Sequence, residues 1–358
     1  MVLQGSGQIS LSDVQTELGG TTPIGMDEYY TANPNNFTNG ISGLPNTASS
    51  RMDMSMFYGK GKHVFGMLSP ATLSSSVVVF GTKLYRKEYT GPVVQVRRSS
   101  DQVTQDFYAS TTGALTTARN GTGTSYAAWL GAATGYVPTW YDQSGRGAHL
   151  TQSATSNQPV LTTAGKIVYN GTSQFLEKAY NVDVNTHTFS YIVNCKCYSY
   201  GQTPSLHQSP LTSRGDVPGY PTGYMVYKYP DPDNGFYHWN GGGNSGWQTI
   251  PSSGSGVTCA LNTSYNVAGS YNGTVLTTDG QGRVISSTGS VSTTVNGVTT
   301  TPSTISLALN ESKPFRVGAG ATESATGLFF WNGEVNTVMY FNTPISTVDR
   351  DTLLANLS

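Results

Sequence analysis

Short apolar segments separated by glycine- and asparagine-containing turns dominate the second half of the chain. From Lys166 onward, runs rich in β-branched and aromatic residues alternate with such turns, two of which are Asn170-Gly171 and Asn272-Gly273. Asn-Gly between two apolar runs is a hairpin signal, because both residues tolerate the positive φ of a tight turn. Regularly spaced short strands predict a mainly β fold, either a β-sandwich or a jelly roll.

The same patterns place the individual elements. Strands are expected at 93–101, 136–141, 167–172, 189–193, 224–229, 236–239, 265–270 and 275–278, with closing strands at 315–320 and 329–341. Helices are expected at 125–131 and 347–357, and also at 77–89, where aliphatic residues and tyrosines have helical spacing ahead of Thr90-Gly91-Pro92.

Residues 1–62 differ from the rest and predict a small, partly helical module. A capped helix is expected at 10–20, and a degenerate repeat joins small helices to aromatic pairs. So short a segment cannot bury a large core, so we expect it to pack on another subunit or on the main domain, although a self-contained helical cap is an alternative. Residues 63–80 are the expected linker, and 81–358 the sandwich. The residues expected to anchor or assemble the module are Leu11, Val14, Leu18, Tyr29, Tyr30, Phe57 and Tyr58.

Composition limits the classes of partner. Charged residues make up 11% of the chain and the net charge is −1, which argues against a nucleic-acid partner because phosphate binding needs a basic surface. No apolar run approaches the length of about 20 residues that spans a membrane, and the first residues do not resemble a signal peptide. The three cysteines are too few for a disulfide framework and lack metal-ligand spacing, so free buried thiols are expected.

The run from Trp140 to Gln152 carries a tight turn with several polar side chains. With 84–92 and 96–101, it resembles the α-L-arabinofuranosidase B catalytic domain, and the resemblance extends over about 75–345. It implies a concanavalin-like, lectin-like sandwich. We expect the motif to brace a turn and define the fold, with ligand contact as the alternative. Its residues are Asp142, Gln143, Ser144, Gly145, Arg146 and His149.

The resemblance also bears on catalysis. The family's nucleophile is a Glu on a central strand that corresponds here to 223–229, which contains no carboxylate. The family's acid/base falls at Thr322 or Glu323. Without the nucleophile, hydrolysis by the family mechanism is not expected. The alternative is a glycoside hydrolase with a rearranged pair of carboxylates, for which Glu323, Glu334, Asp231 and Asp233 are available.

The sequence patterns of residues 1–62 resemble those of an N-terminal module found in structural proteins of tailed marine bacteriophages. Together these resemblances predict a non-catalytic virion protein, of fibre or decoration type, located on the particle. Its expected partners are capsid, neck, tail or baseplate proteins and a host-surface glycan, with a homo-oligomer, by analogy a trimer, as the assembly. A pure scaffold is a further alternative.

An aromatic and amide-rich region on a Gly-rich loop is the predicted glycan-binding surface. No cofactor is expected. Calcium at 231–235 is a minor alternative, since its oxygen ligands do not match EF-hand spacing. The predicted glycan-binding residues are Tyr229, Asp231, Asp233, Asn234, Tyr237, Trp239, Asn240 and Trp247.

Overall fold

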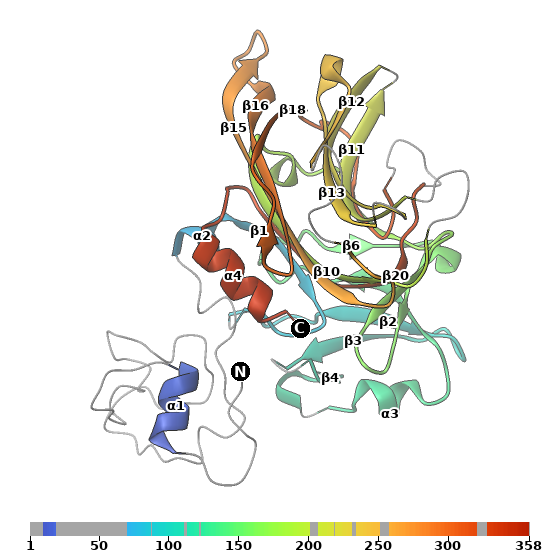
Figure 1. Ribbon diagram of the computed structural model, residues 1–358. Helices are drawn as coiled ribbons and strands as arrows, with labels where there is room; N and C mark the ends of the chain where they lie inside the picture. The colour runs from blue at the N-terminus through green and yellow to red at the C-terminus, as the bar shows by residue number, and fades with distance from the viewer. Residues whose placement is uncertain are drawn as a thin grey trace.

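The computed structural model describes residues 10–18, 70–86, 88–110, 113–121, 123–200, 207–217, 219–230, 234–250, 258–320 and 328–357. Its strands form two antiparallel sheets that face each other, which confirms the predicted β-sandwich (Figure 1). The first sheet contains, in spatial order, β1 (Ser76–Gly81), β20 (Asn332–Phe341), β10 (Thr188–Cys197), β15 (Ser264–Thr278), β16 (Val284–Val295) and β18 (Ser303–Ala308), with β17 (Val298–Thr299) beside β16.

The second sheet contains β9 (Leu176–Lys178), β19 (Phe315–Val317), β11 (Gln208–Val217), β12 (Tyr220–Lys228), β13 (Phe236–Gly241) and β14 (Trp247–Ile250). Shorter strands join the two sheets at one end: β2 (Val94–Arg98), β3 (Thr104–Ala109), β4 (Leu115–Thr116), β5 (Gly135–Trp140), β6 (Leu150–Thr151), β7 (Val160–Leu161) and β8 (Ile167–Asn170). Short 3-10 turns lie at Arg119–Gly121, Thr155–Asn157, Val182–Val184 and Gly243–Ser245.

Four α-helices lie in the described part of the chain: α1 (Leu11–Leu18), α2 (Pro70–Ser75), α3 (Tyr126–Leu130) and α4 (Thr347–Ala355). The helices predicted at 10–20, 125–131 and 347–357 are therefore confirmed. The Ser125 and Ser346 side chains accept hydrogen bonds from the backbone of their own helices, as capping residues do. No described helix is long and apolar enough to cross a membrane.

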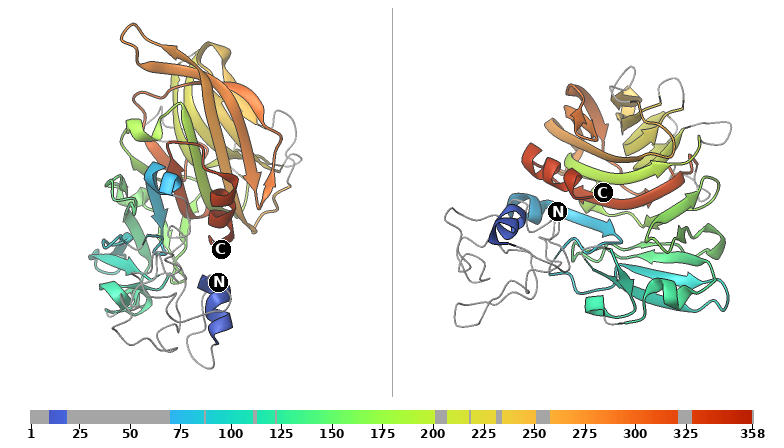
Figure 2. Two further views of the ribbon diagram at one scale, coloured as in Figure 1. Left: turned by 90° about the vertical axis from the view of Figure 1, so that its left-hand side faces the viewer. Right: turned by 60° about the horizontal axis from the view of Figure 1, so that its bottom comes forward.

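The main core lies between the two sheets. Alternation along β10 sends Phe189, Tyr191 and Val193 into it, and they meet Tyr224 of β12. The intervening residues of β10 face the other way, where Ile192 packs with Leu353 of α4 in a second apolar cluster. Figure 2 shows α4 lying against this outer face of the first sheet.

The predicted helix at 77–89 is wrong, because its first residues form β1. Val77 to Phe80 are all buried, since the interior lies on one side of β1 and the α4 cluster on the other. A strand buried on both faces shows no alternation, so its sequence resembles that of a buried helix. β1 also begins inside the segment predicted as a linker.

The predicted hairpin at Asn272-Gly273 is also wrong, because β15 continues through both residues to Thr278. A Cβ on Gly273 would stand 2.4 Å from the carbonyl oxygen of His187, and one on Gly289 would stand 2.0 Å from the carbonyl oxygen of Asn272. These glycines allow close backbone approach between paired strands. Asn170-Gly171 does form a turn, with φ of +74° at Gly171, but β8 pairs with β7 and β20 and not with the strand that follows.

The run 142–146 occupies the edge of β1 that no described strand covers. The Asp142 carboxylate accepts the N–H of Val79 at 2.9 Å, and the N–H of Gln143 donates to the carbonyl of Val79 at 2.8 Å. The Gln143 amide donates to the carbonyl of Gly81 and accepts the N–H of Tyr85, and the Arg146 guanidinium donates to the carbonyl of Ser76. Side chains therefore replace the missing neighbouring strand.

Candidate functional site

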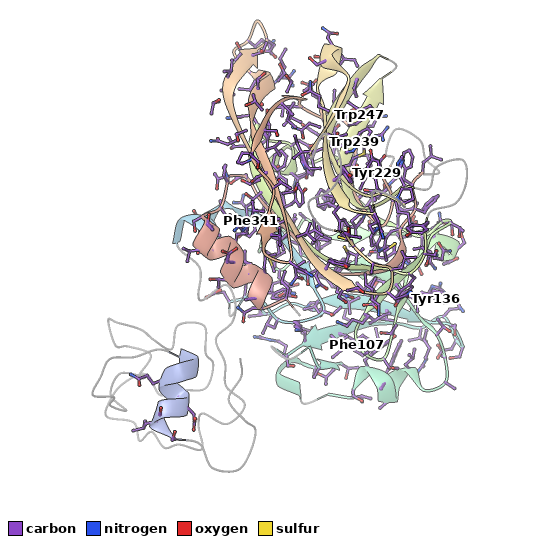
Figure 3. All side chains as sticks on the ribbon, in the orientation of Figure 1. Phe107, Tyr136, Tyr229, Trp239, Trp247 and Phe341 are labelled. Carbon is purple, nitrogen blue, oxygen red and sulfur yellow. The ribbon has the colours of Figure 1, made fainter. Side chains whose placement is uncertain are left out.

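The outer face of the second sheet carries a cluster of aromatic side chains, which we call the aromatic face. Residues at alternate positions share one side of a strand, so Tyr227 and Tyr229 at the end of β12 point outward, as do Tyr237 and Trp239 of β13. Trp247 of β14 completes the set (Figure 3).

These rings are in contact with one another. Ring centroids lie 4.2 Å apart for Tyr229 and Tyr237, 5.4 Å for Tyr227 and Trp239, and 6.0 Å for Trp239 and Trp247. Tyr229, Trp239 and Trp247 are partly exposed, so the cluster extends from the sheet to the surface. The indole N–H of Trp239 is buried and has no hydrogen-bond partner in the described part of the chain.

A buried arginine lies under this face. Arg214 of β11 is 5% exposed, and its guanidinium lies 4.6 Å from the ring centroid of Trp247 and 5.9 Å from that of Phe329. It also donates to the Tyr227 hydroxyl at 3.2 Å. A cation stacked on an indole fixes that ring in place, and so holds the aromatic face in one arrangement.

Two carboxylate-bearing segments end beside the aromatic face. Asp231 and Asp233 lie between Pro230 and Asn234, outside the described residues, and the N–H of Asn234 donates to the carbonyl of Pro230 at 2.9 Å. The buried Lys228 ammonium donates to the side-chain oxygen of Asn234 and to the carbonyl of Tyr229. The ends of this segment are thus held at the tip of β12.

The second segment, 321–327, contains Glu323 and also lies outside the described residues. Its ends are joined by a hydrogen bond from the N–H of Gly320 to the carbonyl of Leu328 at 2.9 Å. A Cβ on Gly320 would stand 3.2 Å from the Tyr227 ring and 3.0 Å from Phe329. The ends of the first segment therefore lie beside Tyr229, and those of the second lie beside Tyr227.

Phe329 and His207 complete the surroundings. Phe329 has φ of +55°, an unusual value for a bulky residue, and its ring meets that of Tyr227 edge-on at 5.3 Å. The His207 ring lies 4.4 Å from Tyr229, and partial burial lowers its pKa. Sequence reasoning missed Arg214, Tyr227, Phe329 and His207, although the period-two pattern at Tyr227 and Tyr229 was a usable signal.

The structure divides the predicted glycan-binding set. Tyr229, Tyr237, Trp239 and Trp247 come together, whereas Asn240 lies on the inner side of β13. There its side-chain oxygen lies 2.7 Å from Nε2 of His238, and Nδ1 of His238 lies 3.1 Å from the Tyr191 hydroxyl. Burial lowers the pKa of His238 to about 4, so this imidazole is neutral and belongs to the core.

The motif residues lie away from the aromatic face. Besides Val79, Asp142 accepts hydrogen bonds from the N–H groups of Ser144 and Ala148 and from the Ser144 hydroxyl. His149 accepts the N–H of Asp142 at 3.1 Å, and burial lowers its pKa. Gly145 has φ of +87°, as its tight turn requires. With its oxygens so occupied, Asp142 is unsuited to acid–base work in this arrangement.

No group of three or more His, Cys, Asp or Glu side chains that could hold a metal ion occurs among the described residues. The predicted free, buried thiols are confirmed for Cys195, Cys197 and Cys259. Val14 of α1 is buried, but Tyr29, Tyr30, Phe57 and Tyr58 lie outside the described residues. The predicted anchoring, oligomer and calcium are untested and stay predictions.

Part of the chain matches the model of a known family. Residues 75–209 match the model of the catalytic domain of α-L-arabinofuranosidase B. The chain carries an arabinofuranosidase-like β-sandwich. The matched segment runs from the start of β1 into β11, and it includes the turn that covers the edge of β1.

The chain also has a limited similarity to several solved structures, at low sequence identity. An arabinofuranosidase complexed with arabinofuranosyl-α-1,2-xylobiose has a TM-score of 0.49 and 12% identity, with 81% of this chain and 65% of that chain covered. A mutant GH54 α-L-arabinofuranosidase soaked with 4-nitrophenyl α-L-arabinofuranoside has a TM-score of 0.48 and 12% identity, with 79% and 63% covered. A Trypanosoma rangeli sialidase in complex with sialic acid has a TM-score of 0.41 and 15% identity, with 62% and 31% covered.

The chain thus spans less than two thirds of the length of the arabinofuranosidase chains that it matches. Among the curated proteins, none matches the sequence significantly.

The prediction of a non-catalytic virion protein, with its fibre and decoration roles, is wrong. The family match is to the catalytic domain of a glycoside hydrolase, which favours the alternative of an enzyme. The absence of a carboxylate within 223–229 does not by itself exclude hydrolysis, because Asp231 and Asp233 follow that strand directly in the sequence.

Proposed function

We propose that this protein is a glycoside hydrolase acting on α-L-arabinofuranosides, with its active site on the aromatic face. The observation that carries the proposal is the position of the two acid-bearing segments: the ends of 231–233 lie beside Tyr229, and the ends of 321–327 lie beside Tyr227. The match of residues 75–209 to a hydrolase catalytic domain supports the same reaction class.

The chemistry requires two carboxyl groups on opposite sides of the scissile bond. One protonates the leaving oxygen, and the other either attacks the anomeric carbon or activates a water molecule. We assign the general acid to Glu323 and the nucleophile or base to Asp231 or Asp233. A separation of about 5–5.5 Å between the two carboxyl groups gives retention of configuration, and about 6.5–9.5 Å gives inversion.

The aromatic face would bind the sugar. Sugar rings present C–H faces that pack on aromatic rings, and the partly exposed Trp239 and Trp247 supply such surfaces. The Arg214 guanidinium packs against the Trp247 ring and supports it through a cation–π contact. The general acid, which we assign to Glu323, must be protonated at the start of the reaction.

The test is hydrolysis of 4-nitrophenyl α-L-arabinofuranoside by the full chain. Asp231→Asn, Asp233→Asn and Glu323→Gln are compared with Glu311→Gln, a control whose carboxylate is 49% exposed and pairs with Arg283. We expect Glu323→Gln and one of the two Asp variants to lower kcat by about 10²–10⁴-fold. Glu311→Gln should match the unmodified protein.

Full activity in all three site variants would refute the assignment of the acids. Absence of hydrolysis by the unmodified chain on furanosides of arabinose would refute the proposed function itself. The anomeric configuration of the first product, followed by NMR, distinguishes retention from inversion.

A further inference from the structure

A second polar site lies on the opposite outer face of the sandwich, at the start of β20. Lys196 of β10 stands directly across from Glu334, and Gly333 allows the two strands to approach closely, since a Cβ there would stand 1.9 Å from the carbonyl oxygen of Lys196. Lys196 shares its side of β10 with Ile192, which packs against α4. The site is therefore on the α4 side of the first sheet, whereas the aromatic face belongs to the second sheet.

Glu334 forms the floor of this site. Its side chain is 11% exposed, and one carboxylate oxygen accepts the Tyr198 hydroxyl at 2.6 Å. The other oxygen accepts the Asn336 amide at 3.1 Å. The Lys196 ammonium is 3.9 Å from Glu334, too far for a hydrogen bond, and 5.5 Å from the Tyr198 ring centroid.

Asn336 carries an acceptor that no described group satisfies. The residue is 6% exposed, and its Oδ1 is buried without a hydrogen-bond partner. The amide orientation is fixed, because Nδ2 donates both to Glu334 and to Oδ1 of Asn194 at 3.3 Å, and a flipped amide would place three acceptors together. A buried acceptor left unpaired is unfavourable, so a ligand hydroxyl that donates to it relieves that cost.

The site is rigid before any ligand arrives. Asn194 donates to Asn266 at 2.6 Å, and Asn266 donates to the carbonyl of Leu354 in α4 at 2.8 Å. This chain of amides ties the floor of the site to a helix of the domain. A prearranged site spares a ligand the entropy of ordering its partners.

The available groups define the ligand chemistry. The site offers a partly exposed ammonium donor and an amide acceptor without a partner, both next to the Glu334 carboxylate, with the Tyr198 ring beside the ammonium. A hydroxyl group both accepts and donates, and neighbouring hydroxyls on a sugar ring can satisfy the two sides together. A metal cation fits poorly, because the Lys196 charge repels it and Tyr198 already donates to the carboxylate.

We propose that Lys196, Tyr198, Glu334 and Asn336 form a second saccharide-binding site, separate from the aromatic face. It binds the sugar without cleaving it, since only one carboxylate is present among these four residues. On a polysaccharide-degrading enzyme, such a site would hold a neighbouring part of the polymer. Binding at this site does not depend on the proposed hydrolysis.

The test is a ligand-observed NMR titration of the full chain with L-arabinose, which contains no bond for a hydrolase to cleave. The site variants are Lys196→Met and Glu334→Gln, and their controls are Lys178→Met and Glu311→Gln. Each of the four is made twice, once in the unmodified chain and once in a chain that also carries Trp247→Ala, which disrupts the aromatic face. We expect saturable binding to survive Trp247→Ala and to weaken by about tenfold or more in the two site variants, the effect of losing a hydrogen bond to a charged group. The controls should bind as the unmodified chain does.

Three results would overturn the proposal: no saturable binding in the Trp247→Ala chain, unchanged binding in both site variants, or calcium binding without sugar binding. Lys196→Met guards against misfolding as the cause, because that side chain is 28% exposed and its unfolding midpoint should not move. A chain that cleaves arabinofuranosides but fails this test would lose the second site only. One that passes the test without cleaving them would lose the proposed function only.

Discussion

Replacing Asp142 by Ala should strongly destabilise the fold, because one buried carboxylate serves three backbone N–H groups. Those of Val79, Ser144 and Ala148 lie 2.9, 2.8 and 3.2 Å from its oxygens, and the residue is 1% exposed. A buried donor that loses its partner costs about 1–3 kcal/mol. The three losses are not additive, because the N–H groups share one carboxylate and water enters the space that it leaves. We therefore expect Asp142→Ala to lower the free energy of unfolding by about 4 kcal/mol.

Asp142→Asn should lose roughly half as much. The amide keeps one acceptor oxygen for the N–H groups of Val79 and Ser144, but it presents a donor to that of Ala148. The assay is urea unfolding followed by circular dichroism, with the free energy of unfolding taken from the midpoint and slope. The slope should not change if only the native state is affected.

The matched control is Asp279→Ala. Asp279 accepts the N–H groups of Gln281 and Arg283 at 2.9 Å each, but in a solvent-exposed turn. Water replaces the lost acceptor there, so the unfolding midpoint should barely move. If Asp142→Ala unfolds at the same urea concentration as Asp279→Ala, the edge of β1 does not depend on this side chain and the reasoning fails.

Two further predictions concern the interior. Because burial lowers the pKa of His238 from 6.5 to about 4, the neutral imidazole contributes fully to stability above pH 6.5, and this contribution, about 3 kcal/mol, is lost as the pH falls toward 4. His238→Phe should show a flatter dependence of unfolding free energy on pH over that range, and an equally steep fall would contradict the assignment. Burial also raises the thiol pKa of Cys197 and Cys259 to about 11, so a thiol reagent at pH 8 should label them only after unfolding, and rapid labelling of the native protein would contradict their burial.

Much of the fold was predictable because runs of β-branched and aromatic residues are bounded by turn residues. β10, β12 and β13 correspond to such runs, and α3 and α4 to the two helices predicted at 125–131 and 347–357. β1 was predicted as part of a helix because a continuous apolar run does not distinguish a buried strand from a buried helix, and the residues after it have helical spacing. The continuation of β15 through Asn272-Gly273 was not predicted, because a glycine after asparagine can serve either in a turn or in close contact between strands.

The candidate site was only partly predictable, since its residues come from segments far apart in the chain. The aromatic residues of β13 and β14 are near in sequence and were recognised together. Arg214, Tyr227 and Phe329 join them only through strand pairing and the return of the chain at Gly320. Sequence spacing gives no measure of such contacts.

The position of β20 has a consequence for how the protein is made. Among the strands of the first sheet it comes last in the sequence, yet it lies between β1 and β10 and pairs with both. Until the ribosome has synthesised β20, no strand lies between β1 and β10 to pair with both. The core-facing residues of these two strands then remain exposed. Pairings so distant in sequence form slowly, so the nascent chain spends most of its synthesis without a closed core. Stalled or truncated chains that stop before Asn332 should therefore require chaperones or be degraded, however complete their other strands are.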